Sequence, residues 1–390
     1  MNYTHKIIRL YQVLKYFFAF FVSRFYKREN IWLLAERGTD ARDNSYRFFL
    51  YLVEKCKDVR PYYVISNESP DISRFNKYKE SLVEYGSFRH YVLYSRANVL
   101  ISTHIHGYAP VPSLFLKLDK YFHINDTKYT VMLQHGITKD YIPALTYPNT
   151  KLDLIVCGAK PEYEFMKAEF GYPSENIQYL GFCRFDELQQ RCETEKIILL
   201  MPTWRSWLLS RDIEFSEYFK KYIELIFSPE LLSLLRDTGY KLCFYPHHEV
   251  QPYINKFMSY NECDVLIIAD KFHYDVQDLL KRSALLITDY SSVFFDFVYM
   301  KKPVIFYQFD KEQYRAFHYS EGYFNYDDGF GPVVSSVSEV ITQIKYLLDR
   351  SCFIDLKYAS RIDEYFPLND KANCERTYNY IKRQMKHKLK

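Results

Sequence analysis

Short apolar segments alternate with helical periodicity along most of the chain. Runs of four or five residues rich in Val, Ile, Leu and aromatic side chains are typical of strands buried on both faces of a parallel sheet. Between these runs, apolar positions recur three or four residues apart, which indicates helices that cross from one parallel strand to the next. We predict strands at residues 31–35, 62–65, 99–102, 130–133, 154–157 and 177–180, followed by 197–201, 241–245, 265–268, 285–288 and 304–307.

The predicted strands fall into two series, separated by the polar stretch LQQRCETEK at residues 188–196. With 390 residues, the chain also exceeds the length that one hydrophobic core usually serves. The sequence therefore predicts an α/β fold with two Rossmann-like parallel-sheet domains facing a cleft, preceded by an amphipathic helix. We expect this helix at residues 1–28, the N-terminal domain at 29–190 and the C-terminal domain at 191–390, with the last helix able to pack back on the N-terminal domain.

The segment LLITDYSSVFFDFVYMKKPVIFY, residues 285–307, passes from apolar to polar and back to apolar. It predicts a buried strand, a polar turn that contains Asp289, Ser291 and Ser292, a helix, and the next parallel strand. Unpaired backbone N–H groups at the start of that helix favour an anion, and the two serine hydroxyls could donate to a phosphate. On these residues alone, a plain helix N-cap is the favoured alternative.

Ligands of open parallel sheets bind beyond the carboxyl ends of the strands, and another such end carries the sequence QHGITKD. His135 has the side chain whose ordinary pKa suits proton transfer at neutral pH, and Gly136 permits close approach of the backbone. For an isolated His-Gly pair, a histidine that merely bonds to local backbone is slightly the more frequent outcome.

Two strand ends of the second series also carry polar side chains. The sequence PTWRSW offers the hydroxyl of Thr203 and the guanidinium of Arg205, whose planar fork matches phosphate oxygens, with a surface salt bridge as the alternative. The sequence PHHEV offers His247, His248 and Glu249. Because consecutive extended residues point to opposite sides, this cluster disfavours a metal site, and we assign no metal ligands.

The strand-end rule thus places an imidazole on the first domain opposite arginine, histidine and serine side chains on the second. This combination predicts phosphoryl chemistry, in which hydrogen-bond donors hold a diphosphate and a base activates a hydroxyl. The sequence implies no organic cofactor, and a divalent cation remains compatible with it.

The first 28 residues carry basic side chains and no acidic one. Their longest uncharged stretch, residues 16–23, is far below the roughly 20 apolar residues of a membrane-spanning helix. The pattern favours a helix that lies in the interface of an anionic membrane, ahead of a helix packed on the protein's own core and of a signal peptide. The basic residues are Lys6, Arg9, Lys15, Arg24, Lys27 and Arg28.

Composition excludes two classes of protein. The formal net charge of +4 is too slight to indicate nucleic acid as a partner. The eight cysteines contain no C-x-x-C pair, so neither a disulfide scaffold nor a structural zinc site is expected, and a reducing cytoplasm fits.

Several blocks, in order, resemble the CDP-glycerol glycerophosphotransferases, the group of teichoic acid polymerases and primases. They extend from residue 35 to the C-terminus, and those containing PTWR and TDYSS are the most specific. The resemblance implies a glycosyltransferase-B-like (GT-B-like) architecture, an acceptor domain followed by a nucleotide-donor domain, and peripheral attachment to the cytoplasmic face of the cell membrane. The blocks are AERGTDARDNSYRFF, QHGITKD, GFCRFDEL, MPTWR, YPHHE, LITDYSSVFFDF, KPVIFY and NDKANCERTYNYI.

The same resemblance implies roles for individual residues. His135 and His247 would be catalytic, with His135 as the base. The chain departs from the family pattern at Tyr245, where members often have Arg, so His248 could take over phosphate binding from His247. It also has HGIT in place of the usual HGT-type motif, which suggests a different acceptor. The donor would be bound by Thr203, Arg205, His248, Asp289, Ser291 and Ser292, with Gly136, Arg184 and Asp186 in support.

The expected reaction is an in-line displacement. His135 removes a proton from an acceptor hydroxyl, which attacks the β-phosphorus of CDP-glycerol and expels CMP. The expected acceptor is a teichoic acid or capsular polysaccharide, lipid-linked or not, and addition of one unit is slightly favoured over polymerisation. The alternatives are a CDP-ribitol or sugar-phosphate transferase, a GT-B glycosyltransferase that uses a sugar nucleotide, and a non-catalytic membrane-associated assembly protein.

Overall fold

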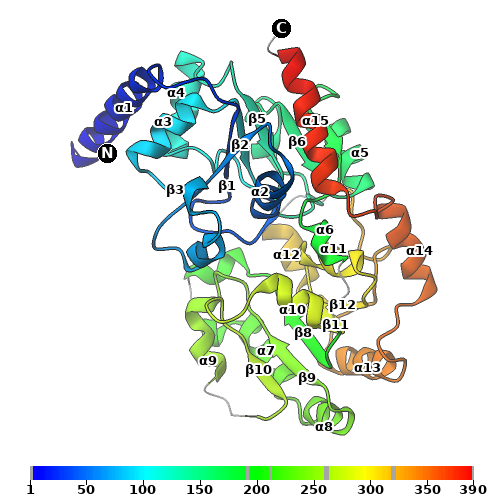
Figure 1. Ribbon diagram of the computed structural model, residues 1–390. Coiled ribbons are helices and arrows are strands. Elements are labelled where there is room, and N and C mark those ends of the chain that lie inside the picture. The colour runs from blue at the N-terminus through cyan, green and yellow to red at the C-terminus, as the bar shows by residue number, and fades with distance from the viewer. Residues whose placement is uncertain (1–2, 190–192, 211–212, 259–262, 318–321, 389–390) are drawn as a thin grey trace.

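The computed structural model describes residues 3–189, 193–210, 213–258, 263–317 and 322–388. These residues form two α/β units, one above the other in Figure 1, each built on a parallel sheet with helices on both faces. The predicted fold class is therefore confirmed. Every strand predicted from the apolar runs is present, with ends that shift by at most two residues.

The first sheet has the strand order β3-β2-β1-β4-β5-β6-β7, and all its pairings are parallel. Alternate side chains of β1 enter two separate cores, because successive residues of a strand point to opposite faces. Helices α2 and α15 cover one face, and α3 and α4 cover the other. The strands are β1 (Ile31–Ala35), β2 (Arg60–Ile65), β3 (Leu82–Glu84), β4 (Val99–Ser102), β5 (Tyr129–Met132), β6 (Leu154–Cys157) and β7 (Ile177–Tyr179). The helices are α1 (Tyr3–Ser23), α2 (Asn44–Lys55), α3 (Phe88–Arg96), α4 (Pro112–Phe122), α5 (Lys160–Glu169) and α6 (Phe185–Leu188).

The second sheet has the order β10-β9-β8-β11-β12-β13, again with parallel pairings. The short strands β3 and β13 were not predicted, since three and two residues give too little pattern to recognise. The strands are β8 (Ile197–Met201), β9 (Lys241–Phe244), β10 (Leu266–Ile268), β11 (Leu285–Thr288), β12 (Val304–Tyr307) and β13 (Val333–Val334). The helices that follow β8 in the chain are α7 (Glu217–Ile226), α8 (Pro229–Thr238), α9 (Ile254–Met258), α10 (Val276–Arg282), α11 (Val293–Tyr299), α12 (Lys311–Phe317), α13 (Val337–Leu348), α14 (Leu356–Tyr365) and α15 (Asn373–Lys388), the last of which packs on the first sheet.

The chain passes between the units twice. It leaves the first unit after Gln189 and returns after α14, so that α15 packs on the first sheet, where Tyr378 lies 5.7 Å from the ring of Trp32. The two crossings lie side by side, because the side chain of Gln189 contacts that of Asn369. The predicted domain boundary at residues 190–191 lies outside the described residues.

One hydrophobic core runs from the first sheet into the second, with Phe185 of α6 stacked on Tyr299 of α11 at 4.1 Å. Next to it, the guanidinium of Arg184 is 4% exposed and bonds to both units. Its Nε and Nη2 each donate to Asp296 of α11 at 2.7 Å, and its Nη1 donates to Asp43, the N-cap of α2, at 2.8 Å. Arg184 therefore forms buried ion pairs that join the two units.

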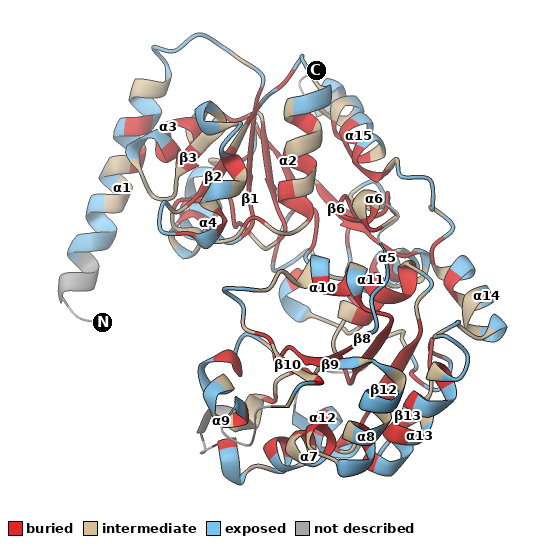
Figure 2. Cartoon of the chain, turned by 60° about the horizontal axis from the view of Figure 1, so that its bottom comes forward, coloured by how far each residue is buried: buried red, intermediate tan, exposed pale blue. Residues whose placement is uncertain are grey.

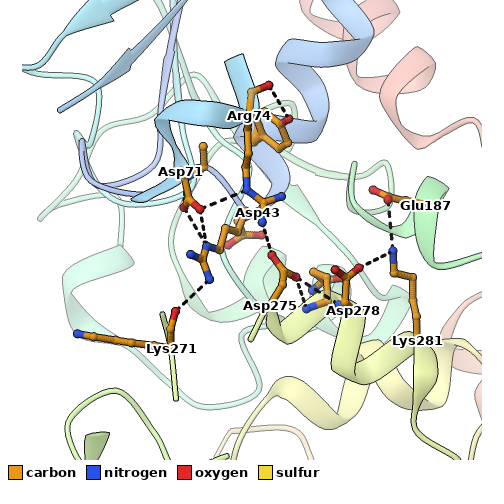
Figure 3. Close-up of polar contacts among 12 residues, drawn as sticks. Asp43, Asp71, Arg74, Glu187, Lys271, Asp275, Asp278 and Lys281 are labelled. Carbon is orange, nitrogen blue, oxygen red and sulfur yellow. Dashed lines mark hydrogen bonds and ion pairs between the residues drawn. The ribbon is translucent and has the colours of Figure 1, made fainter. Parts of the chain in front are cut away.

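More exposed ion pairs join the same two units further along the interface (Figure 3). Arg74 of the first unit donates to Asp275 of the second at 2.5 Å, and Lys281 of α10 pairs with Glu187 at 3.4 Å. These pairs are only part-buried, whereas the shared core and Arg184 are buried and are the stronger links.

Helix α1 lies at the edge of the first unit, with one face packed on the protein and the others exposed. Tyr16 and Ala19 are buried against α3 and α4, whereas the remaining faces project into solvent (Figures 1 and 2). Phe18 and Phe21 are 60% and 57% exposed, which is unusual for side chains of this size. Within the described residues, no helix has both the length and the apolar character needed to cross a membrane.

Candidate active site

The carboxyl ends of the two sheets meet, which brings predicted residues from both units into contact. Gly136 follows β5 in the first unit, and Ser292 precedes α11 in the second. A Cβ atom added to Gly136 would lie only 2.7 Å from Ser292 Oγ. The absence of a side chain at residue 136 therefore lets the loop that carries His135 touch the Ser291–Ser292 turn.

The loop around His135 is anchored by hydrogen bonds of Gln134 to neighbouring residues. Gln134 has a positive φ of 56°, a conformation that costs free energy in a non-glycine residue and needs support from its surroundings. That support is visible: the Gln134 side chain donates to Val156 O and to Glu162 at 2.8 and 3.1 Å, and Asn44 donates to Gln134 O at 2.7 Å. The backbone thus presents His135 outward while its neighbours on either side are anchored.

His135 stacks on a second histidine that the sequence analysis did not single out. The rings of His104 and His135 are 4.7 Å apart and nearly parallel, at 9°. Arg37 Nε donates to His104 Nε2 at 3.0 Å, so the ring hydrogen of His104 must be on Nδ1, which lies 2.9 Å from Thr103 Oγ1. Both nitrogens of His104 are occupied, and its ring forms a fixed, neutral platform beneath His135.

The electrostatics keep both imidazoles uncharged. The protein crowded around His135 and the positive charges of Arg37 and Arg184 lower its pKa to about 4. Loss of solvation, together with His135 and Arg37, lowers the pKa of His104 to about 3. His135 is nonetheless accessible to solvent at the meeting edges. At neutral pH it is therefore an exposed imidazole able to accept a proton.

On the second unit, His247 and His248 follow β9 as predicted. The His247 ring lies 6.1 Å from that of Trp204 and 4.1 Å from that of His248. His248 is exposed, and loss of solvation and the charge of Arg37 lower its pKa, the latter an effect exerted from the opposite unit. The two histidines therefore lie on the sheet edge that faces the first unit.

Arg205 requires a correction. We expected it to hold the donor diphosphate, but its side chain is fully buried. Its Nε and Nη2 donate to Asp310 at 2.6 and 3.0 Å, and its Nη1 donates to Asp289 at 2.8 Å and to Thr203 O at 2.7 Å. Because these carboxylates occupy the guanidinium, Arg205 is a structural residue in this conformation.

Asp289 belongs to the same buried network and does not line a ligand site as expected. Its carboxylate accepts from Arg205, from the backbone N–H of Thr203 at 2.8 Å and from Tyr222 Oη at 3.1 Å. The network fixes the loops after β8 and β11 relative to each other. Thr203 Oγ1 is buried beside it without a hydrogen-bond partner in the described part of the chain.

Of the remaining predicted residues, some stabilise the architecture and others lie where the two sheets meet. Asp186 accepts from the backbone N–H groups of Asn373 and Cys374, both at 2.9 Å, and so caps α15. Ser291 Oγ accepts from Val293 N at 3.3 Å, which is the capping alternative, whereas Ser292 makes no capping bond through its side chain. Asp186 and Arg184 thus support the architecture, and Ser292 remains at the contact with Gly136.

Two edge residues were missed although the strand-end rule applies to them. Arg37 follows β1 in the sequence AERGTD, and His104 follows β4 in STHIHG, just as His135 follows β5. Within the described ranges, no group of three or more His, Cys, Asp or Glu side chains is placed to hold a metal ion.

A family model described as CDP-glycerol:poly(glycerophosphate) glycerophosphotransferase matches residues 16–383. The chain is 35% identical over 375 residues to the minor teichoic acid biosynthesis protein GgaB of Bacillus subtilis (strain 168). This match covers 92% of the present chain and 40% of that protein. It is 34% identical over 155 residues to a teichoic acid poly(glycerol phosphate) polymerase of Bacillus spizizenii (strain ATCC 23059 / NRRL B-14472 / W23), covering 38% and 36% of the two chains.

The fold resembles that of the wall teichoic acid polymerase TagF. The superposition has a TM-score of 0.65 at 17% identity and covers 98% of this chain and 100% of the TagF chain. These matches cover less than half the length of either of the two relatives.

The buried network predicts that Arg205→Met lowers the free energy of unfolding by about 3 to 5 kcal/mol, because Asp289 and Asp310 would be left buried without a partner. Urea unfolding measures this. Arg282→Met, which removes a half-exposed pair with Glu195, is the control and should cost about 1 kcal/mol or less. Unchanged stability of the Arg205 variant would mean that the guanidinium is free for a ligand.

The charge around His135 predicts that Arg37→Gln raises the pKa of His135 toward its ordinary value, since a nearby cation disfavours the imidazolium. NMR titration of labelled histidines would follow this pKa directly. Arg37→Lys keeps the charge and should leave the pKa close to that of the unmodified protein. An equal shift in both variants would contradict an electrostatic cause.

Proposed function

Because the chain belongs to the CDP-glycerol:poly(glycerophosphate) glycerophosphotransferase family, we propose that it transfers glycerol phosphate from CDP-glycerol to a hydroxyl group of a teichoic acid and releases CMP. The observation that carries the proposal is the contact between the His135 loop of one unit and the Ser291–Ser292 turn of the other. A loop that carries a proton acceptor thereby touches a turn that carries hydroxyl donors.

In the proposed reaction, His135 accepts the proton of the acceptor hydroxyl as its oxygen forms a bond to the β-phosphorus. The bond between that phosphorus and the oxygen of CMP breaks, and CMP leaves with the electron pair. The neutral state of His135 suits it to this task, since an imidazole must be unprotonated to act as a base. The proton then passes to solvent when His135 is regenerated.

The donor diphosphate would be held by Ser292, His247 and His248 from the second unit. Arg37 would supply the positive charge that Arg205, with its buried partners, does not offer. A bound diphosphate would offset the charges of Arg37 and Arg184 and so raise the pKa of His135. The base would therefore gain strength only when the donor is in place.

The proposal predicts that the purified protein releases CMP from CDP-glycerol in the presence of a teichoic acid primer. His135→Ala should lower kcat by about 100-fold or more, because a positioned general base contributes at least that much. CMP release from CDP-glycerol, CDP-ribitol and UDP-sugar reactions can be compared in the same assay.

The matched control is His123→Ala, which removes an exposed histidine at the end of α4 and should leave the rate unchanged. UDP release without CMP release would replace the proposal by a glycosyltransferase. Full biological activity of a folded His135→Ala protein would point to an assembly role without catalysis.

We also propose that the protein attaches peripherally to an anionic membrane, on its cytoplasmic face, through α1, and that the acceptor is lipid-linked. The support is the apolar surface that α1 shares with the start of α3 and the end of α4, where Phe18 lies 5.6 Å from Phe88 and Phe17 lies 5.7 Å from Phe122. Exposed apolar area of this extent is costly in water and is typical of an interaction surface. Of the basic residues counted in this segment, the side chain of Lys6 lies outside the described part.

This attachment predicts that the triple variant Leu14→Glu, Phe18→Glu, Phe21→Glu no longer floats with vesicles of anionic phospholipid, whereas the unmodified protein does. All three side chains are more than half exposed, so the changes spare the core. The double variant Phe353→Glu, Leu356→Glu alters even more exposed apolar residues at the start of α14 and should still float. Flotation of the triple variant at the original level would refute attachment through α1.

A further inference from the structure

A basic groove lies beside α1, away from the meeting edges of the sheets. It has a volume of about 550 Å³ and is lined by the segment after α1, the start of β2 and one face of α3. Four cationic side chains surround it, and Glu29 is its one lining acid. The cations are Lys27, Arg60, Arg89 and Arg96.

Three of the cations are held in place by neighbours. Glu29 bridges Arg60 and Arg96, the latter at 3.1 Å. The Arg96 guanidinium also lies 4.9 Å from the ring of Tyr26, and that of Arg89 donates to two backbone carbonyls, at 2.9 and 3.2 Å. One carboxylate and a few carbonyls leave an excess of positive charge, fixed in orientation before any ligand arrives.

The groove is also amphipathic. Val92 and Leu93 of α3, only 7% and 4% exposed, form its floor, and Phe88 lies at its margin. Phe25, 76% exposed, precedes Tyr26 in the chain and continues the apolar surface of α1 up to the groove. A ligand that fits must therefore carry negative charge next to an apolar body.

The groove does not belong to the transferase site. It includes Arg60, the first residue of β2, and Glu29, which precedes β1, so it lies at the amino ends of these strands. His104 and His135 follow the carboxyl ends of β4 and β5, at the opposite edge of the same parallel sheet. A donor bound at the reacting edge does not reach this groove.

We propose that this groove binds the phosphate-bearing head group of an anionic membrane lipid, whose acyl chains lie along the exposed side of α1. The proposal rests on the membrane attachment proposed above and deepens it, since it adds a defined lipid site to a general apolar and basic surface. Charge complementarity and continuity with the α1 surface favour a lipid over free phosphate, which would leave the apolar floor uncovered.

The test uses dihexanoyl-phosphatidylserine below its critical micelle concentration, with the full-length protein and isothermal titration calorimetry. We expect saturable binding of this serine lipid. Binding of dihexanoyl-phosphatidylcholine and of inorganic phosphate should each be at least tenfold weaker. The double variant Arg60→Gln, Arg89→Gln should weaken binding of the serine lipid at least tenfold, because it removes two of the charge-assisted donors. Lys27→Glu, at an exposed position, is a second variant with the same expected result should the first fail to fold.

The matched control is Lys117→Gln, Lys120→Gln, which removes two exposed charges from α4 and should leave lipid binding unchanged. Equal binding of the two lipids, equal binding of inorganic phosphate, or displacement by CDP-glycerol would each overturn the proposal. Short-chain lipid binding without vesicle flotation would refute the membrane attachment alone. Flotation without short-chain lipid binding would refute the groove alone.

Discussion

The geometry of the whole site depends on the buried guanidinium of Arg184. It joins Asp43, at the start of the helix behind β1, to Asp296 of α11, the helix that begins at the Ser291–Ser292 turn. A charge removed from water is tolerated only when its partners stay in place, so this bond fixes how one sheet edge meets the other. After burial and the charge of Arg37, the charge of Arg184 also contributes to the lowered pKa of His135.

The first unit prepares the imidazole before any ligand is present. The strained backbone at Gln134 is stabilised by Glu162 and Asn44, and the ring of His104 is fixed by Arg37 and Thr103. Positioning of this kind reduces the reorganisation needed during a reaction. Arg37 has two effects, since it fixes the ring beneath His135 and lowers the pKa of His135 itself.

Sequence patterns sufficed for the two sheets and for the edges at which polar residues gather, because strands buried on both faces leave an unmistakable apolar run. They did not suffice for pairing between distant residues. Arg205 and Asp310 are 105 positions apart, and only the folded chain shows that their charges satisfy each other. The rule that ligands bind at the carboxyl ends of strands, which located His135, could also have located His104. No sequence pattern shows that the two rings stack. The narrow buried face of the N-terminal helix agrees with the expected packing on the protein's own core, whereas attachment of its wide exposed face to a membrane stays a proposal.

The two chain crossings between the units are adjacent at Gln189 and Asn369, so the covalent links between the units lie close together. Any relative motion of the units would be centred where these two links lie. The stacked rings of Phe185 and Tyr299 lie close to them, since the side chain of Gln189 also donates to Tyr299 Oη. Such a motion would have to break the part-buried pair of Arg74 and Asp275 and the buried bonds of Arg184 to Asp43 or Asp296. The buried bonds of Arg184 therefore set the separation of the two sheet edges, and breaking them would be the costly step in any opening of the units.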